Sequence, residues 1–312
     1  MKFITALILA LACAAPAAAY DASALGALRV SALGAGLRGM TAIPMPARAE
    51  RVNAAAYRNS GADLLAGSNM FLGLPYVLGP LGEGQGAEFD RGPLVSYAGL
   101  DCTTFVEQAM AFSLGGSEAE ALDLLRRIRY RGGSISYENR NHFTELDWLP
   151  NNIAAGFLRD ITADIAGSEA RTATKLISKR AWYAAKTEAD LDGFDWEAPA
   201  ARAARAARLR ALGAALPDQR ASINYVPLEA LPRLLNSIPH GTVISIVRED
   251  QTDKPTLVSH QLLLIDGPRG KILRHAAQGR QVLDTDAAQY IAGLPGAKWR
   301  ILGFNLAQVL PQ

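Results

Sequence analysis

Cysteine is scarce in this chain of 312 residues, which has two, Cys13 and Cys102. A predicted N-terminal cleavage removes Cys13, so an internal disulfide is excluded for the mature protein. An excess of one charge is also lacking, because 32 Lys and Arg face 30 Asp and Glu, a formal net charge of +2. This balance does not predict nucleic-acid binding. After the N-terminus, no stretch approaches the roughly 18 apolar residues of a transmembrane helix, so no stable membrane insertion is expected.

The first twenty residues have the three parts of a secretory signal peptide. Lys2 is followed by the apolar stretch 3–15, and Ala17-Ala18-Ala19 offers a cleavage site before Tyr20. The sequence therefore predicts a signal peptide over 1–19 and export to the periplasm. Residues 10–12, Ala-Leu-Ala, form a poor lipobox for Cys13, so no lipoprotein is expected.

Helical and strand patterns are segregated along the chain. The predicted helices are 61–72, which ends a helical N-terminal region over 20–70, then Cys102–Leu114, Ser117–Arg129 and most of 150–220. The predicted strands are 243–247, 257–265, 271–276 and 299–304, with a hairpin turn over 267–270. This order predicts an α+β fold. We expect a catalytic domain over 71–312 with a helical insertion at about 117–220.

The sequence around Cys102 indicates a nucleophile. A loop ends in Asp101-Cys102, and a largely apolar helix begins at the cysteine. The positive end of a helix dipole favours thiolate over thiol, which predicts a pKa below the ordinary value of about 8.5. The backbone N–H groups of the same helix start can hold the oxyanion of a tetrahedral intermediate.

A cysteine nucleophile needs a base, and the chain offers four histidines: His142, His240, His260 and His275. No two have the short spacing of a zinc site on one element, so neither metal nor cofactor is expected. His240 lies in a turn that leads into a strand, and we assign it to structure.

His260 and His275 lie on two strands joined by the predicted hairpin. If the turn centres between Pro268 and Arg269, Leu262 faces His275, and His260 shares a sheet face with His275. The two residues are then diagonal neighbours at about 7–8 Å, within reach of a side-chain hydrogen bond. One ring can act as the base while the other holds it in the required tautomer.

Two motifs resemble the NlpC/P60 superfamily of peptidoglycan hydrolases. Residues 101–106, Asp-Cys-Thr-Thr-Phe-Val, are similar to its Asp-Cys-Ser-x-Phe-Val motif, and 75–79, Pro-Tyr-Val-Leu-Gly, to its Pro-Tyr-x-x-Gly element. The sequence resembles one branch more closely, the N-acetylmuramoyl-L-alanine amidase-like family DUF1460. The blocks that carry this resemblance are Gly73 to Phe112, Ile128 to Gly133 with Tyr137, Arg140 to Phe143 and Asp147-Trp148, and Val258 to His260.

The resemblance implies a papain-like core and cleavage of the bond between the lactyl group of N-acetylmuramic acid and L-alanine. It implies that Cys102 is the nucleophile, His260 the base and His275 the orienting residue. The implied substrate contacts are Tyr76, Asp101, Thr103 and His142. Leu262 departs from the superfamily, which usually has glycine two residues after the base.

Four functions remain open at this stage. The first is a cofactor-independent amidase acting on peptidoglycan fragments (muropeptides). The second is an endopeptidase that cuts between γ-D-glutamate and a diamino acid. The third is a catalytically silent murein-binding protein, and the fourth is an acyltransferase on the same fold.

Overall fold

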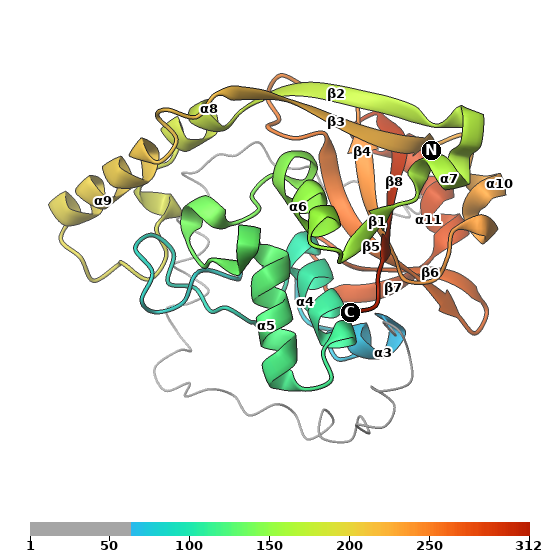
Figure 1. Cartoon of the computed structure of the whole chain (residues 1–312), viewed down its shortest axis with the longest axis horizontal. Helices are drawn as coiled ribbons and strands as arrows, with labels where there is room; N and C mark the ends of the chain where they lie inside the picture. Colours follow the sequence, from blue (N-terminus) through green and yellow to red (C-terminus); the bar gives the residue numbers. More distant parts are fainter. Residues whose placement is uncertain (1–63) are drawn as a thin grey trace, which may run out of the picture.

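The computed structural model describes residues 64–312. The predicted signal peptide and the predicted N-terminal region up to residue 63 lie outside the described residues. Figure 1 shows helices on either side of an antiparallel sheet. Among residues 64–312, no helix combines the length and the apolar character needed to cross a bilayer.

All strand pairs of the sheet are antiparallel, and the main order is β2-β3-β8-β4-β5-β6-β7, with β1 pairing β8. The strands are β1 (Leu158–Asp160), β2 (Arg171–Ser178), β3 (Asp218–Pro227), β4 (Thr242–Arg248), β5 (Val258–Gly267), β6 (Gly270–Ala276), β7 (Val282–Asp286) and β8 (Ile301–Val309). The four predicted strands correspond to β4, β5, β6 and β8, which confirms them. The α+β class is confirmed as well.

The described helices are mostly short. The α-helices are α3 (Leu64–Asn69), α4 (Cys102–Leu114), α5 (Glu118–Arg129), α6 (Leu149–Ala154), α7 (Thr162–Ala166), α8 (Lys179–Ala184), α9 (Pro199–Ala211), α10 (Leu231–Leu234) and α11 (Ala287–Gly293). Single turns lie at η2 (Arg131–Gly133), η3 (Tyr137–Asn139), η4 (Thr144–Trp148), η5 (Gly167–Glu169), η6 (Glu188–Asp190), η7 (Leu235–Ser237) and η8 (Leu294–Gly296). Ser117 caps α5 by accepting from the N–H of Glu120, as its sequence spacing predicts.

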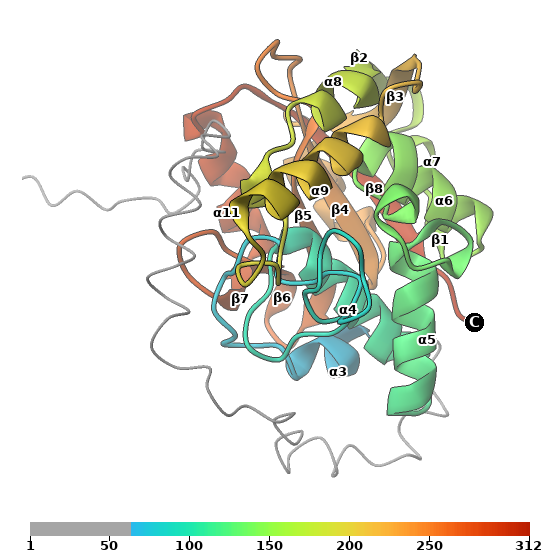
Figure 2. The same cartoon turned by 90° about the vertical axis from the view of Figure 1, so that its left-hand side faces the viewer.

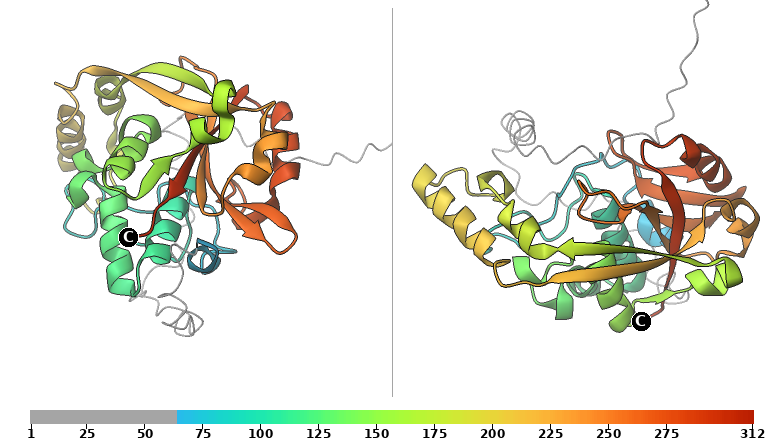
Figure 3. Two further views of the ribbon diagram at one scale, coloured as in Figure 1. Left: turned by 45° about the vertical axis from the view of Figure 1, so that its right-hand side comes forward. Right: turned by 90° about the horizontal axis from the view of Figure 1, so that it is seen from above.

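Two apolar clusters lie on opposite faces of the central strands. One contains Phe105 and Val106 of α4 with Leu263 and Ile265 of β5. The other contains residues of α10 and α11 with Leu262 and other alternate residues of the same strands. Figure 3 shows the corresponding helices on the two sides of the sheet. The alternation of β5 side chains therefore decides which helix each one meets.

The segment 117–220 is less helical than predicted. It contains α5 and α9, but it also contains β1, β2 and the first residues of β3. The pairing of β2 with β3 runs from Arg171↔Tyr225 to Ser178↔Asp218. This ribbon carries α8 and α9 away from the central sheet, as Figure 1 shows, and in Figure 2 the two helices lie in front of the sheet. The prediction of a mostly helical 150–220 was wrong for β2, whose burial alternates with a period of two.

Candidate active site

Cys102 is the first residue of α4, where a capping box fixes the start of the helix. Asp101 Oδ1 accepts from the N–H and the hydroxyl of Thr104, both at 2.8 Å, and Thr104 Oγ1 accepts in return from the N–H of Asp101 at 3.0 Å. Asp101 Oδ2 accepts from the N–H of Gly79 at 2.9 Å. The Asp101 carboxylate thus joins the 75–79 loop to the helix start, and the position of the thiol follows from both.

The 75–79 loop lies against the residues that precede the helix. Val77 N–H donates to Leu100 O, and Leu100 N–H donates to Pro75 O, both at 3.1 Å. A Cβ on Gly99 would lie 2.9 Å from Pro75 O, so a side chain there would push the two segments apart. Tyr76 is held between these contacts and is partly buried against the α4 core. This places Tyr76 on the segment bonded to the helix start.

His260 and His275 meet where β5 and β6 separate. Backbone pairing between these strands runs from Gly267↔Gly270 to Leu263↔Arg274. One step further along, the same register sets Leu262 opposite His275, as predicted. There the strands are joined by side chains, because His260 Nε2 lies 2.8 Å from His275 Nδ1. The predicted pairing of the two imidazoles is confirmed.

The thiol contacts β5 close to the point where β5 and β6 separate. The backbone N–H of Gln261, the residue next to His260, hydrogen-bonds to the sulfur of Cys102. The imidazole pair lies on the other face of the sheet, where the ring of His275 contacts Tyr290 of α11 edge to face at 5.4 Å. Leu262 is fully buried in the apolar cluster of that face. The sulfur of Cys102 therefore contacts β5 one residue along the strand from His260.

Burial sets the protonation of this group of residues. It raises the pKa of Cys102 to about 11, helped by the negative charge of Asp101 and opposed by the N–H of Gln261 and by Thr103. Burial lowers the pKa of His260 well below its ordinary value, and that of His275 to about 4. The predicted lowering of the Cys102 pKa was wrong, because desolvation by burial and the negative charge of Asp101 raise it. In the resting state, the thiol and both imidazoles are neutral at pH 7.

A buried ion pair holds the middle of α4. Glu107 Oε2 accepts from Arg129 Nη1 at 2.7 Å, and its Oε1 accepts from Trp148 Nε1 at 3.1 Å. Arg129 Nη2 also donates to Leu81 O at 2.8 Å, which ties the loop after residue 79 to α5. Sequence reasoning missed this pair. The signal was a carboxylate at Glu107 inside a largely apolar helix, which requires a buried partner.

A second buried carboxylate anchors the start of β5. Glu145 lies in η4 and accepts a short hydrogen bond from the N–H of Leu257, three residues before His260. Burial raises the pKa of Glu145, and the N–H of Leu257 opposes the rise. No sequence motif marked this residue, because its partner is a backbone group more than one hundred positions away.

The remaining predicted residues are placed in different surroundings. The hydroxyl of Thr103 lies 4.0 Å from the sulfur of Cys102. His142 Nε2 lies 2.7 Å from Tyr137 O, and its ring is 4.7 Å from both Tyr137 and Trp182. His142 thus belongs to an aromatic cluster, and burial lowers its pKa well below the ordinary value. Substrate contacts by Tyr76, Asp101, Thr103 and His142 stay predictions.

Within residues 64–312, no group of three or more His, Cys, Asp or Glu side chains is arranged to hold a metal ion. His240 has the structural role assigned to it, because its Nδ1 accepts from the N–H of Asp266 at 3.0 Å.

Fold and site together define a mixed α+β protein in which a thiol at a helix start contacts β5, and the His260 imidazole of β5 is paired with the His275 imidazole of β6. The family model described as AmiA-like, N-acetylmuramoyl-L-alanine amidase-like, matches residues 66–297. The chain therefore belongs to this amidase-like family.

Solved structures agree with this assignment. A Legionella pneumophila protein described as DUF1460 is 31% identical, with a TM-score of 0.77, over 82% of this chain and 91% of that one. Two structures of an N-acetylmuramoyl-L-alanine amidase from Bacteroides uniformis are also similar. One is 24% identical over 80% of this chain and 100% of that one, with a TM-score of 0.57. The other is 25% identical over 80% and 98%, with the same TM-score of 0.57. A search of curated proteins found no match.

Proposed function

We propose that this protein is a cysteine-dependent peptidoglycan amidase with a papain-like core of the NlpC/P60 type. In this proposal it acts in the periplasm and cleaves the bond between the lactyl group of N-acetylmuramic acid and L-alanine in muropeptides. Membership of the amidase-like family supports the peptidoglycan substrate. The observation that carries the cysteine mechanism is the contact of the Cys102 sulfur with β5 beside the bonded pair His260–His275.

The chemistry begins from a neutral thiol and a neutral base. The proposed mechanism assigns the donor role to His260 Nε2, which lies 2.8 Å from His275 Nδ1, and this leaves His260 Nδ1 as the acceptor of the thiol proton. The sulfur attacks the lactyl carbonyl as the proton moves to Nδ1, and a tetrahedral oxyanion forms. The capping box already uses the N–H of Thr104, so the N–H of Cys102 is the first donor that the helix offers to the oxyanion.

The second half of the reaction returns the proton. The imidazolium of His260 gives its Nδ1 proton to the L-alanine nitrogen, the C–N bond breaks, and the peptide leaves with a free amine. A thioester remains on Cys102. His260 then takes a proton from water, the resulting hydroxide attacks the thioester, and the thiol is restored as the lactyl carboxylate leaves.

Digestion of defined muropeptides, read by mass spectrometry, tests this proposal. Cys102→Ala and His260→Asn should abolish release of the peptide, because they remove the nucleophile and the base. His240→Asn is the matched control, since Asn can still accept from Asp266; it should retain activity. EDTA should have no effect.

The products identify the bond. A free sugar and an intact peptide support the amidase, whereas a sugar-dipeptide would show an endopeptidase. Full activity of Cys102→Ala, or loss of activity with chelator, would exclude the cysteine mechanism. An enzyme that releases nothing from any muropeptide would contradict the proposed function.

A further inference from the structure

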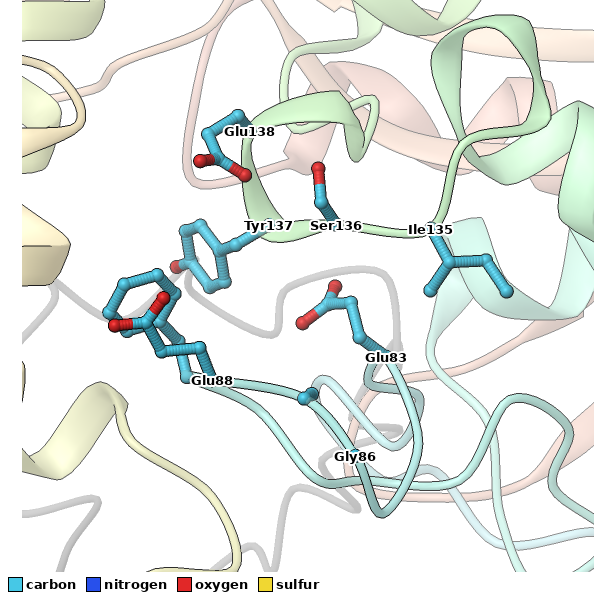
Figure 4. A pocket seen from close by; sticks show the side chains of 9 residues that line it. Glu83, Gly86, Glu88, Ile135, Ser136, Tyr137 and Glu138 are labelled. Atoms are coloured by element: carbon cyan, nitrogen blue, oxygen red, sulfur yellow. The ribbon is translucent and has the colours of Figure 1, made fainter.

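A pocket lies between the loop that follows residue 79 and the segment after α5. Its volume is about 250 Å³. Figure 4 shows the two segments facing each other, with Glu83 directed into the space between them. The residues that line it are Glu83, Gly86, Ala87, Glu88, Phe89, Ile135, Ser136, Tyr137 and Glu138. These include three carboxylates and no Lys or Arg.

Glu83 is the buried carboxylate of this pocket, and one of its two oxygens has no hydrogen-bond partner. Its Oε1 accepts from Arg140 Nε at 2.6 Å, and its side chain is 4% exposed. Its Oε2 is buried without a hydrogen-bond partner. A buried carboxylate oxygen with no donor costs free energy, so this oxygen favours the binding of a donor group.

The charges around Glu83 leave an excess of negative charge. Arg140 also pairs with Asp90 at 2.8 Å, so one guanidinium serves two carboxylates. Glu88 is paired with Arg208 of α9 at 2.8 Å, whereas Glu138 adds a further carboxylate to the pocket wall. A small cation that carries N–H groups satisfies both the excess charge and the missing donor.

The pocket lies along the loop that is bonded to the start of the helix that carries Cys102. Gly79 is bonded to Asp101, the neighbour of Cys102. Glu83 follows Gly79 by four residues, which span at most about 14 Å. A peptide of three residues covers roughly 10 Å, and a long side chain adds several ångströms more. These two lengths are of the same order, so a stem peptide that extends from Cys102 along this loop has the length to bring the side chain of its third residue toward Glu83.

We propose that this pocket binds the side-chain ammonium of a diamino acid, the third residue of the stem peptide. The inference rests on the proposed function, since it assumes that muropeptides are the substrate. Glu83 Oε2 accepts one N–H of the ammonium group, and the Glu138 carboxylate lies on the opposite wall. The pocket thus selects stem peptides by the charge of their third residue.

A pair of muramyl tripeptides tests this proposal, one with L-lysine and one with Nε-acetyl-L-lysine as the third residue. Wild-type kcat/KM should be about tenfold lower or more for the acetylated peptide, since acetylation removes a charge-assisted hydrogen bond. Glu83→Gln should lose most of this preference. Asp90→Asn is the matched control: it also removes a partner of Arg140, but Asp90 does not line the pocket, so the preference should persist.

A second variant covers the case in which Glu83→Gln does not fold. Glu138→Gln changes only the opposite wall and should reduce the preference about threefold, because it removes charge without removing the buried acceptor. Equal cleavage of the two peptides by the wild type overturns the proposal. So does a preference that survives both Glu83→Gln and Glu138→Gln.

A binding measurement distinguishes the failure of the pocket proposal from the failure of the proposed function. If the wild type cleaves no muropeptide, the proposed function fails, and calorimetry with the two peptides still decides the pocket. Weakening of about tenfold on acetylation, absent in Glu83→Gln, supports the pocket; equal affinities, or no binding, overturn it.

Discussion

The protonation of Cys102 gives a prediction that separates two kinds of cysteine hydrolase. In one kind a thiolate–imidazolium pair exists before substrate binds, and in the other the proton moves during attack. Burial raises the pKa of Cys102 to about 11 and lowers that of His260. These directions predict the second kind, in which the thiol of Cys102 and the imidazole of His260 are both neutral in the resting protein.

The size of the effect follows from the two pKa values. At pH 7.5, an ordinary thiol with a pKa of about 8.5 is about 9% thiolate. A thiol with a pKa of about 11 is about 0.03% thiolate, which is roughly 300-fold less. Because the thiolate is the species that reacts, alkylation of Cys102 by iodoacetamide at pH 7.5 should be about 300-fold slower than that of an exposed peptide thiol with a pKa of about 8.5.

Mass spectrometry of the peptide that contains Cys102 measures this rate at each pH. The rate should keep rising up to about pH 11, and His260→Ala should leave it nearly unchanged at neutral pH. Absorbance at 240 nm measures the thiolate directly over the same pH range, and Cys102→Ser supplies the blank for that measurement.

One result would refute the reasoning: rapid alkylation below pH 8 that disappears in His260→Ala. It would show a preformed ion pair that burial does not suppress. Slow alkylation, in contrast, does not indicate a silent protein, because a base that acts during attack gives the same result. Turnover of muropeptides decides that question.

Two further predictions concern stability. Arg129→Met leaves the buried carboxylate of Glu107 without its charged partner, and urea unfolding should show a loss of about 3–5 kcal/mol; the double variant with Glu107→Gln should recover part of it, and a loss within error of zero would contradict the buried pair. The pKa of His275 is about 4 in the folded protein and about 6.5 when unfolded, so the unfolded state binds the extra proton between these values. Stability should fall by about 3 kcal/mol from this residue as pH drops from 6.5 to 4. His275→Phe should remove that part of the pH dependence, and equal pH slopes for the two proteins would contradict it.

Much of the site could be predicted from local sequence. Asp101 before Cys102 and Thr104 after it are the residues of a helix cap, so the helix start was readable from three positions. The turn at 267–270 fixed the register of β5 and β6, and register with a period of two placed His260 beside His275. Both inferences rest on residues that are neighbours in sequence or across one tight turn.

The predicted helical insertion at about 117–220 shows where local sequence patterns failed to predict secondary structure. The β2 sequence contains good helix formers and alternates only weakly, and its partner β3 begins forty residues after it ends. A strand of this kind is stabilised by its partner rather than by its own propensity. Pairing at that distance leaves no signal in a short window.

By itself, the sequence determined which groups form the candidate site and on which elements they lie, because helix caps, turns and alternation act over a few residues. Only the tertiary structure decided how those groups are charged, since the pKa of Cys102 depends on how much water the packed sheet and helix exclude. The tertiary structure also paired Glu107 with Arg129 and left Glu83 Oε2 without a donor. Desolvation and long-range pairing are properties of the packed chain, and no short stretch of sequence encodes them.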